Sequence, residues 1–229
     1  MNVSVVIPAH NAAPYLADAI ESVLAQTVAP ADLLVIDDGS TDETGAVAEG
    51  FGDRVQLHRQ KQAGAGAARN RGIELASGDA LAFLDADDVW MPRKLELQLG
   101  AFASDGSLEL VFGNVEHFFS PDLGAERQKV LRMPAGLLAE SVPGLVPGTA
   151  LIRREALLRV GRFATGLGAG EGLDWYARTL DAGLRTLVLD EVVLRRRIHA
   201  GNGTIRRPDA VNDYPRVLRT ILERRRRDL

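Results

Sequence analysis

The sequence lacks cysteine altogether, so none of its 229 residues can form a disulfide or offer a thiolate to a metal. A disulfide framework and a thiolate metal site are therefore excluded. An excess of positive charge is also missing, since the formal net charge at pH 7 is -4. Without a net basic field, the chain is not expected to bind nucleic acid.

Long apolar runs are missing as well. No stretch approaches the roughly 20 apolar residues that span a bilayer, and no basic segment followed by an apolar run stands at the N-terminus. We therefore expect no transmembrane segment, no signal peptide and a cytoplasmic location. The composition, 46% hydrophobic and 25% charged, is ordinary for a globular protein. The length suits one α/β domain over residues 1–229.

Short apolar runs alternate with helical patterns along the first 88 residues. Buried strands are predicted at 2–7, 33–36, 55–58 and 80–84, and helices at 14–26, 40–50 and 64–76. The second helix is expected to start at Ser40, because Ser40 and Glu43 have the spacing of a capping box. This order is typical of an α/β fold with a mostly parallel central sheet and helices on both faces.

The pattern is less regular after residue 88. Strands are predicted at 108–112, 117–119, 150–153, 186–189 and 192–195, and helices at 94–102, 173–182 and 210–227. The stretch 121–147 is rich in glycine and proline, which are typical of loops, and we expect it to cover a site.

Three polar segments directly follow predicted strands, at 8–11, 37–40 and 85–88. The carboxyl ends of parallel strands meet at one edge of a sheet, and ligands of such sheets gather beyond that edge. We therefore expect the three segments to converge on one binding site.

The most informative segment carries Asp85, Asp87 and Asp88 at the end of an apolar strand. Three neighbouring carboxylates repel one another unless a cation lies between them. Mg²⁺ and Mn²⁺ prefer oxygen ligands and usually share them with substrate phosphates. The cluster therefore favours a divalent metal site, and a polar turn between Leu84 and Trp90 is the alternative.

A second acidic position, Asp38, also follows a buried strand. A carboxylate only accepts hydrogen bonds, so it can accept the ring N–H of a uracil base. The alternative is a role in capping the next helix.

The glycine-rich segment 64–72 resembles a phosphate-binding loop only loosely. It lacks the Lys-Ser/Thr ending of a P-loop and does not follow the first strand. Arg69 and Arg71 could still reach a pyrophosphate from the start of a helix. For Arg71, an ordinary surface arginine is an equal alternative.

Five segments, taken as an ordered set, resemble family 2 glycosyltransferases with the GT-A fold. They are VVIPAHN at 5–11, SVLAQT at 22–27, VIDDGSTD at 35–42, ARNRGI at 68–73 and FLDADDVW at 83–90. The resemblance is nearly continuous from residue 3 to about residue 100 and continues more weakly to His199. It implies a nucleotide-sugar-binding half at about 1–100, an acceptor half at about 101–205 and a C-terminal helix at about 207–229.

The resemblance also implies roles for individual residues of the first half. Pro8, Ala9, His10 and Asn11 would line the nucleotide pocket, with His10 against the base. Asp38 would bind the uracil edge.

Further roles follow for the remaining polar residues. Arg69 would support the nucleotide or the carboxylates that follow it, and Asp85 would stand behind those carboxylates. Asp87 would face the ribose and the metal, and Asp88 would bind the Mn²⁺ or Mg²⁺ ion that bridges the diphosphate. His199 would reach the same metal or the diphosphate, and an exposed loop histidine is the alternative.

The sequence departs from the family pattern at the catalytic base. Family members usually carry a Glu-Asp pair whose Asp takes a proton from the acceptor, but here that position is Gly172. Glu171 or Asp174 must then substitute. Glu171 is favoured because it can reach the site from the loop, and Asp174 is expected to orient the acceptor or the loop.

The resemblance therefore predicts a metal-dependent transfer of a sugar, with inversion, from a nucleotide sugar to an acceptor. A UDP-sugar is the favoured donor, and the acceptor is a saccharide, a lipid-linked molecule or a peptide. One alternative is a catalytically weak nucleotide-sugar-binding protein, which the glycine at position 172 favours. Another is a nucleotidyltransferase, but residues 8–11 lack the basic phosphate loop that it needs.

The last predicted helix is amphipathic and rich in arginine. Its apolar stripe consists of Val211, Tyr214, Val217, Leu218, Ile221 and Leu222. Three interpretations are open: a helix packed on its own domain with a solvated basic end, a homodimer contact, or a peripheral contact with an anionic membrane or acceptor.

Overall fold

The computed structural model describes residues 1–121, 123, 142–167, 169–199, 201–202 and 213–227. Within these ranges nine strands form one sheet in the order β3-β2-β1-β4-β8-β6-β9-β5, and β7 pairs with β6. The strands are β1 (Val3–Ala9), β2 (Asp32–Asp38), β3 (Gln56–Gln60), β4 (Ala80–Phe83), β5 (Val89–Trp90), β6 (Leu110–Phe119), β7 (Val142–Gly144), β8 (Leu151–Arg153) and β9 (Thr186–Ile198). The α-helices are α1 (Leu16–Leu24), α2 (Thr44–Glu49), α3 (Ala65–Leu75), α4 (Lys94–Ser104), α7 (Arg154–Val160), α8 (Glu171–Asp181) and α10 (Asp213–Arg227).

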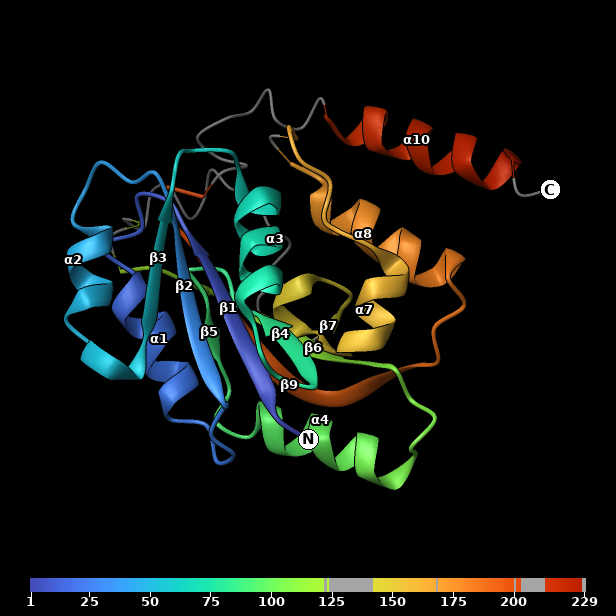
Figure 1. Ribbon diagram of the computed structural model, residues 1–229, viewed down its shortest axis with the longest axis horizontal. Coiled ribbons are helices and arrows are strands. Elements are labelled where there is room, and N and C mark those ends of the chain that lie inside the picture. The colour runs from blue at the N-terminus through green and yellow to red at the C-terminus, as the bar shows by residue number, and fades with distance from the viewer. Residues whose placement is uncertain (122, 124–141, 168, 200, 203–212, 228–229) are drawn as a thin grey trace.

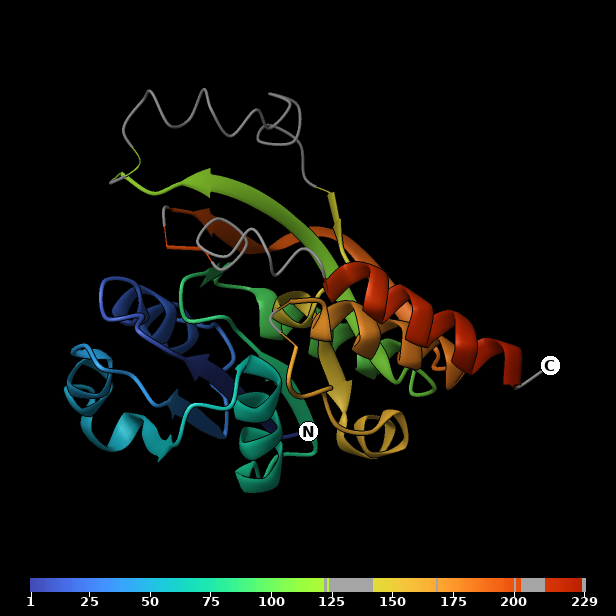
Figure 2. The same cartoon turned by 90° about the horizontal axis from the view of Figure 1, so that it is seen from above.

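The first four strands form a parallel sheet. Strand β1 pairs in parallel with β2 and β4, and β2 pairs in parallel with β3. Every residue of β1 is buried, as expected for the central strand of a sheet that is covered on both faces. Helices α1, α2 and α4 pack on one face, and α3, α7 and α8 pack on the other (Figure 1, Figure 2). The predicted α/β class is confirmed.

The second half of the sheet is mixed. Strand β8 is antiparallel to β4, and β6 is antiparallel to β8 but parallel to β9. The sequence predicted a pair of short strands in the region of β6 and another pair in the region of β9. The structure has a single continuous strand in each region. In β6 the register shifts beside Asn114. A shift of this kind breaks the apolar alternation while the backbone pairing continues. The predicted loop at 121–147 lies largely outside the described residues.

The capping-box prediction for the second helix is wrong. Helix α2 begins at Thr44, and its N-cap residue Glu43 makes no side-chain capping hydrogen bond. The Ser40 hydroxyl instead accepts a hydrogen bond from the Asn11 amide at 3.0 Å. The Asp42 carboxylate accepts from the Thr44 amide at 3.0 Å and from the Ala13 amide at 3.2 Å. These side chains therefore join α2 to the loop after β1.

Helix α4 buries a lysine without a carboxylate partner among the described residues. Lys94 Nζ donates to Gln98 Oε1 at 2.6 Å and to the Ala150 carbonyl at 3.2 Å, and it lies 4.3 Å from the centre of the Trp90 ring. Burial lowers the pKa of Lys94 well below its ordinary value, because removal from water disfavours the charged form. The side chain thereby connects α4 with the β8 end of the sheet.

Helix α10 packs on its own domain. Val217 and Ile221 are buried in a small cluster with Ala177 of α8, and Arg224 binds Asp174 at 3.2 Å and Asp181 at 2.8 Å. For the inner face of α10, the interpretation as a helix packed on its own domain is therefore the correct one. In the part of the chain that the structure describes, no helix is sufficiently long and apolar to cross a bilayer.

Two glycines of segment 64–72, Gly66 and Gly72, allow close packing of α3. A Cβ atom on Gly72 would lie 2.2 Å from Val6 Cγ1 of β1, and one on Gly66 would lie 2.2 Å from the Ala164 carbonyl. Helix α3 can approach β1 and the segment around Ala164 only because both positions lack a side chain.

We expect Gly72→Ala to lower the free energy of unfolding by about 1–3 kcal/mol, because the added methyl overpacks the contact between α3 and β1. The matched control is Gly100→Ala in α4, where an added Cβ meets no atom within 4 Å. The control should raise stability by about 0.5–1 kcal/mol, the usual gain for alanine over glycine in a helix. Urea unfolding measures both changes. A Gly72→Ala variant as stable as the parent would show that α3 can move away from β1.

Candidate active site

The carboxyl ends of β1 and β2 lie side by side, with Ala9 paired to Asp37. Pro8 and Ala9 are the last residues of β1 and are buried, whereas His10 and Asn11 follow them and are exposed. The two strand ends therefore bring the predicted nucleotide-pocket residues to one edge of the sheet.

The His10 ring is held between the end of β2 and the loop after β3. Its Nδ1 lies 2.9 Å from the Asp38 carbonyl, and its Nε2 lies 3.0 Å from Gln62 Nε2. A carbonyl only accepts, so Nδ1 must donate and Nε2 must accept from the Gln62 amide. Beside it, Asn11 has a left-handed backbone with φ of 49°, and its Oδ1 accepts from the Thr41 amide at 2.8 Å.

Asp38 is a buried carboxylate that organises the loop between β3 and α3. It accepts hydrogen bonds from Gln60 Nε2 at 2.7 Å, from the Ala63 amide at 2.9 Å and from the Gly64 amide at 2.7 Å. A carboxylate offers about four acceptor positions. Three of these are occupied within the protein, which leaves one.

Arg69 joins two carboxylates that are distant in the sequence. The guanidinium is 4% exposed and donates to Asp85 Oδ1 at 2.6 Å and to Glu171 Oε1 at 2.8 Å. Burial alone would lower the pKa of Arg69, but the charges and hydrogen bonds of Asp85 and Glu171 outweigh burial and raise it. Arg69 therefore stays charged and holds Asp85 and Glu171 on either side of it. Arg71 is exposed and pairs with Glu74, as a surface arginine does.

Asp87 is held by residues that follow β9. His199 Nε2 lies 3.0 Å from Asp87 Oδ2, and Asn202 Nδ2 donates to the same oxygen at 3.1 Å. The His199 Nδ1 accepts from the Gly201 amide, so Nε2 carries the proton that is donated to Asp87. His199 also packs against Tyr15, with ring centres 4.1 Å apart. The histidine is buried, unlike the exposed loop histidine of the alternative interpretation.

Asp88 is the most deeply buried of the three acids. Its Oδ1 accepts from the Arg197 amide at 2.8 Å. Burial, together with the charges of Asp87 and Asp85, raises the pKa of Asp88 well above its ordinary value. The Arg197 side chain donates hydrogen bonds to the Asp87 carbonyl at 3.0 Å and to Asp18 at 2.7 Å.

The three acids fit a divalent cation in part. Among the described residues, no group of three or more histidine and acidic side chains is arranged to hold a metal ion. Asp88 nevertheless has a suitable environment, because a nearby cation would favour its charged form against burial and two like charges. Mg²⁺ usually takes one or two carboxylates and completes its shell with water and phosphate oxygens. The arrangement can therefore provide a partial site that a diphosphate completes.

The two candidate bases lie in different surroundings. Glu171 is the first residue of α8, rather than a loop residue before it, and reaches the site through Arg69. Asp174 is 7% exposed and binds Arg178 at 2.9 Å and Arg224 at 3.2 Å. Asp174 thus joins α8 to α10. Of the two acids, Glu171 is the better placed to act as the base, because it lies beside Asp85 through Arg69.

The space beside Gly172 is occupied by a proline. A Cβ atom at position 172 would lie 3.1 Å from Pro147 Cδ, which is closer than ordinary van der Waals contact. The segment that carries Pro147 is also fixed to the core, because Trp90 Nε1 donates to the Gly148 carbonyl at 2.9 Å. A larger residue at position 172 would therefore require this segment to shift.

Sequence reasoning did not single out several residues that complete the site. Gln60 and Gln62 bind Asp38 and His10, and Arg197, Asn202 and Tyr15 surround the acidic cluster. Arg197 lies between Arg195 and His199, in a part of the chain where the resemblance to family 2 glycosyltransferases is weaker. That resemblance is the sequence signal that could have indicated it. The glutamines and Asn202 lie in segments without a distinctive pattern, so only the tertiary structure reveals them.

A model of the family described as Glycosyl transferase family 2 matches residues 4–161 of the chain. This match covers more than half of the sequence and includes the segments at the ends of β1, β2 and β4, but not the residues after β9. The protein belongs to glycosyl transferase family 2 and is a glycosyltransferase.

Known relatives agree with this membership. An uncharacterized glycosyltransferase of Rickettsia typhi is 28% identical over 223 residues, which cover 93% of this chain and 69% of the relative. The UDP-Glc:alpha-D-GlcNAc-diphosphoundecaprenol beta-1,3-glucosyltransferase WfgD of Escherichia coli is 40% identical over 116 residues, which cover 50% of this chain and 46% of WfgD.

Solved structures show the shared fold. The crystal structure of S. aureus TarS 1–349 in complex with UDP-GlcNAc superposes with a TM-score of 0.69 at 21% identity, covering 89% of this chain and 60% of TarS 1–349. The complex of the same fragment with UDP gives a TM-score of 0.72 at 20% identity, covering 96% and 64%. This similarity confirms the predicted GT-A fold, and the chain spans less than two thirds of the TarS fragment.

We expect Asp38→Asn to lower the free energy of unfolding by about 1–3 kcal/mol, because an amide nitrogen would face donors that now lack an acceptor. Urea unfolding measures the change. Asp53→Asn, at an exposed position in the short 3-10 helix Gly52–Arg54 before β3, is the control and should leave stability within about 0.5 kcal/mol. If Asp38→Asn unfolds like the parent, the loop after β3 does not depend on this carboxylate.

Proposed function

We propose that this protein transfers a sugar from a UDP-sugar to an acceptor hydroxyl with inversion, at a site that uses Mn²⁺ or Mg²⁺. The proposal rests on one observation. Asp85, Asp87 and Asp88 follow β4 at the edge of the sheet, and Arg69 binds both Asp85 and Glu171, which brings Glu171 beside these acids. The complexes of TarS with UDP-GlcNAc and UDP, and the UDP-Glc in the name of WfgD, support a uridine nucleotide as the donor.

The donor half would be held by the ends of β1 and β2. Asp38 has one acceptor position left, which suits the ring N–H of uracil. His10 lies beside it with an oriented ring, so a flat base can lie against it. An adenine or cytosine base has no ring N–H on its pairing edge for Asp38 to accept, and this difference would favour uridine nucleotides over those two.

The diphosphate would lie over the acidic cluster. Asp88 and Asp87 would hold the cation. If His199 also binds the cation, it would give up its hydrogen bond to Asp87. When bound, Mn²⁺ or Mg²⁺ would stabilise the negative charge that grows on the leaving nucleoside diphosphate. The residues of β9 would keep these carboxylates in place, since the Arg197 amide holds Asp88 and Asn202 holds Asp87.

Glu171 would take the proton from the acceptor hydroxyl. Its Oε1 is occupied by Arg69, whereas its Oε2 has no partner among the described residues. An oriented carboxylate with one free oxygen can accept a proton as the hydroxyl attacks the anomeric carbon. The acceptor itself stays open between a saccharide, a lipid-linked molecule and a peptide, and WfgD is a relative whose name includes a lipid-linked saccharide.

The metal assignment is tested with Asp88→Ala. We expect the variant to lose Mn²⁺-dependent binding of UDP in calorimetry, because it lacks the carboxylate that the cation would share with the diphosphate. Circular dichroism should show an unchanged fold. The control is Asp53→Ala, which should bind UDP like the parent. Equal UDP affinity of Asp88→Ala and the parent in Mn²⁺ would refute the assignment.

The base assignment is tested by comparing Glu171→Gln with Asp174→Asn. We expect Glu171→Gln to lower turnover by roughly 10²–10⁴-fold while UDP binding is retained. Asp174→Asn should instead lower stability by up to about 3–5 kcal/mol, because Arg178 and Arg224 lose a buried partner. Steady-state transfer assays and urea unfolding separate the two effects.

Three outcomes of this comparison would change the proposal. An active Glu171→Gln and an inactive, stable Asp174→Asn would reverse the two roles. If neither change affects transfer, the base lies elsewhere. A parent protein that binds UDP-sugars tightly but neither transfers nor hydrolyses them would be a nucleotide-sugar-binding protein.

A further inference from the structure

Helix α10 carries a charge opposite to that of the whole molecule. Its 15 residues include six arginines against Asp213 and Glu223, while the chain as a whole has a formal net charge of -4. Positive charge is therefore locally in excess on this helix, although the chain as a whole is acidic.

The inner face of this helix is fully used by the fold. Val217 and Ile221 are buried against α8, and Arg224 and Arg225 both bind Asp181 at 2.8 Å. These contacts hold α10 on the domain, so they fix which face of the helix points outward.

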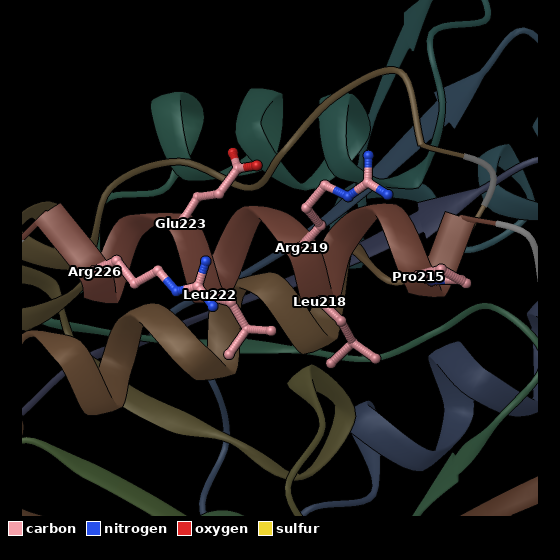
Figure 3. A pocket seen from close by; sticks show the side chains of 6 residues that line it. All are labelled: Pro215, Leu218, Arg219, Leu222, Glu223 and Arg226. Carbon is pink, nitrogen blue, oxygen red and sulfur yellow. The ribbon is translucent and has the colours of Figure 1, made fainter.

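The outer face combines exposed leucines with unpaired arginines. Leu218 is 49% exposed and Leu222 is 57% exposed. They border a hollow of about 560 Å³ that is lined by Pro215, Leu218, Arg219, Leu222, Glu223 and Arg226. Arg219 and Glu223 leave one edge of the helix, and the two leucines leave the other (Figure 3). Among the described residues, Arg216, Arg219 and Arg226 have no acidic partner.

The start of α10 lies next to the candidate site. A Cβ atom on Gly170, which precedes α8, would lie 3.2 Å from Val217 and 3.6 Å from Tyr214. The start of α10 therefore touches the residue before Glu171. Helix α10 runs along α8 on the outside of the molecule (Figure 1, Figure 2).

We propose that the outer face of α10 docks on an anionic lipid bilayer. Helices that lie in a membrane interface bury an apolar stripe and place arginine or lysine at the headgroups, and anionic lipids attract each basic side chain near the surface. Leu218 and Leu222 supply the apolar part, and the arginines around them supply the charge. Docking there would place the Glu171 end of α8 close to the membrane surface.

A second copy of the chain fits this face less well. A two-fold interface brings the same patch of each copy together. Two arginine-rich helices would then face each other across the interface, and their like charges would repel. An anionic surface instead complements the same charges.

The test is co-sedimentation of the protein with phosphatidylcholine vesicles, with and without about one third phosphatidylglycerol. We expect binding only to the anionic vesicles, and we expect added salt to weaken it because salt screens exposed charges. Replacing Arg216, Arg219 and Arg226 with glutamine should weaken binding on the order of 100-fold, at about five-fold for each arginine.

A leucine pair tests the apolar part. Leu218→Ser with Leu222→Ser should weaken vesicle binding by at least about ten-fold. The matched control is Leu158→Ser on α7, a leucine that is 67% exposed, which should bind vesicles like the parent. Circular dichroism and urea midpoints of all variants should equal those of the parent, since every altered side chain is exposed.

Several results would overturn the proposal. One is equal binding to neutral and anionic vesicles, or none to either. Another is a leucine pair or arginine triple variant that still binds like the parent. A parent that is dimeric by light scattering, becomes monomeric in the leucine pair variant and does not bind vesicles would identify the face as an interface between copies. None of these measurements depends on sugar transfer, so failure of the docking proposal and failure of the proposed function are distinguishable.

Discussion

A single buried guanidinium connects the two halves of the candidate site. Arg69 lies on α3, and its partners Asp85 and Glu171 are 16 and 102 residues away in the sequence. Removing a guanidinium from water is costly, and only close carboxylates offset that cost. Arg69 cannot lose either partner without leaving charge poorly compensated in a buried place. The start of α8 is therefore coupled to the end of β4, and a carboxylate from the second half of the chain stands beside those of the first.

The other strand-end acids are held from the opposite side by the end of β9. The Arg197 amide binds Asp88, and His199 binds Asp87. Asp88 nevertheless keeps a raised pKa, because it is buried beside two like charges. Negative charge is thus least compensated at Asp88, which is the place where a cation would be most stabilised.

Much of the fold could be predicted because its first half is locally regular. The apolar runs of β1, β2 and β4 are buried on both faces, so their sequences show no polar alternation and stand out. The prediction was weaker for β6 and β9, where Asn114 and the acidic pair at 190–191 interrupt the pattern although the backbone pairing continues. It failed for the Ser40 capping box, since the loop after β1, rather than the helix, uses that hydroxyl.

The α/β class and the grouping of the acids at the strand ends can be read from the sequence alone. Both follow from the periodicity of apolar residues and from the rule that parallel strands end at one edge. The partner of each acid depends instead on how the helices pack. Glu171 and Asp174 are three residues apart on the same helix, yet Glu171 faces Arg69 and Asp174 faces Arg178 and Arg224. The Asp174–Arg178 pair is local, with i,i+4 spacing on α8. Local spacing does not encode the contacts with Arg69 and Arg224, because these arginines come from α3 and α10, which approach α8 only after the chain has folded.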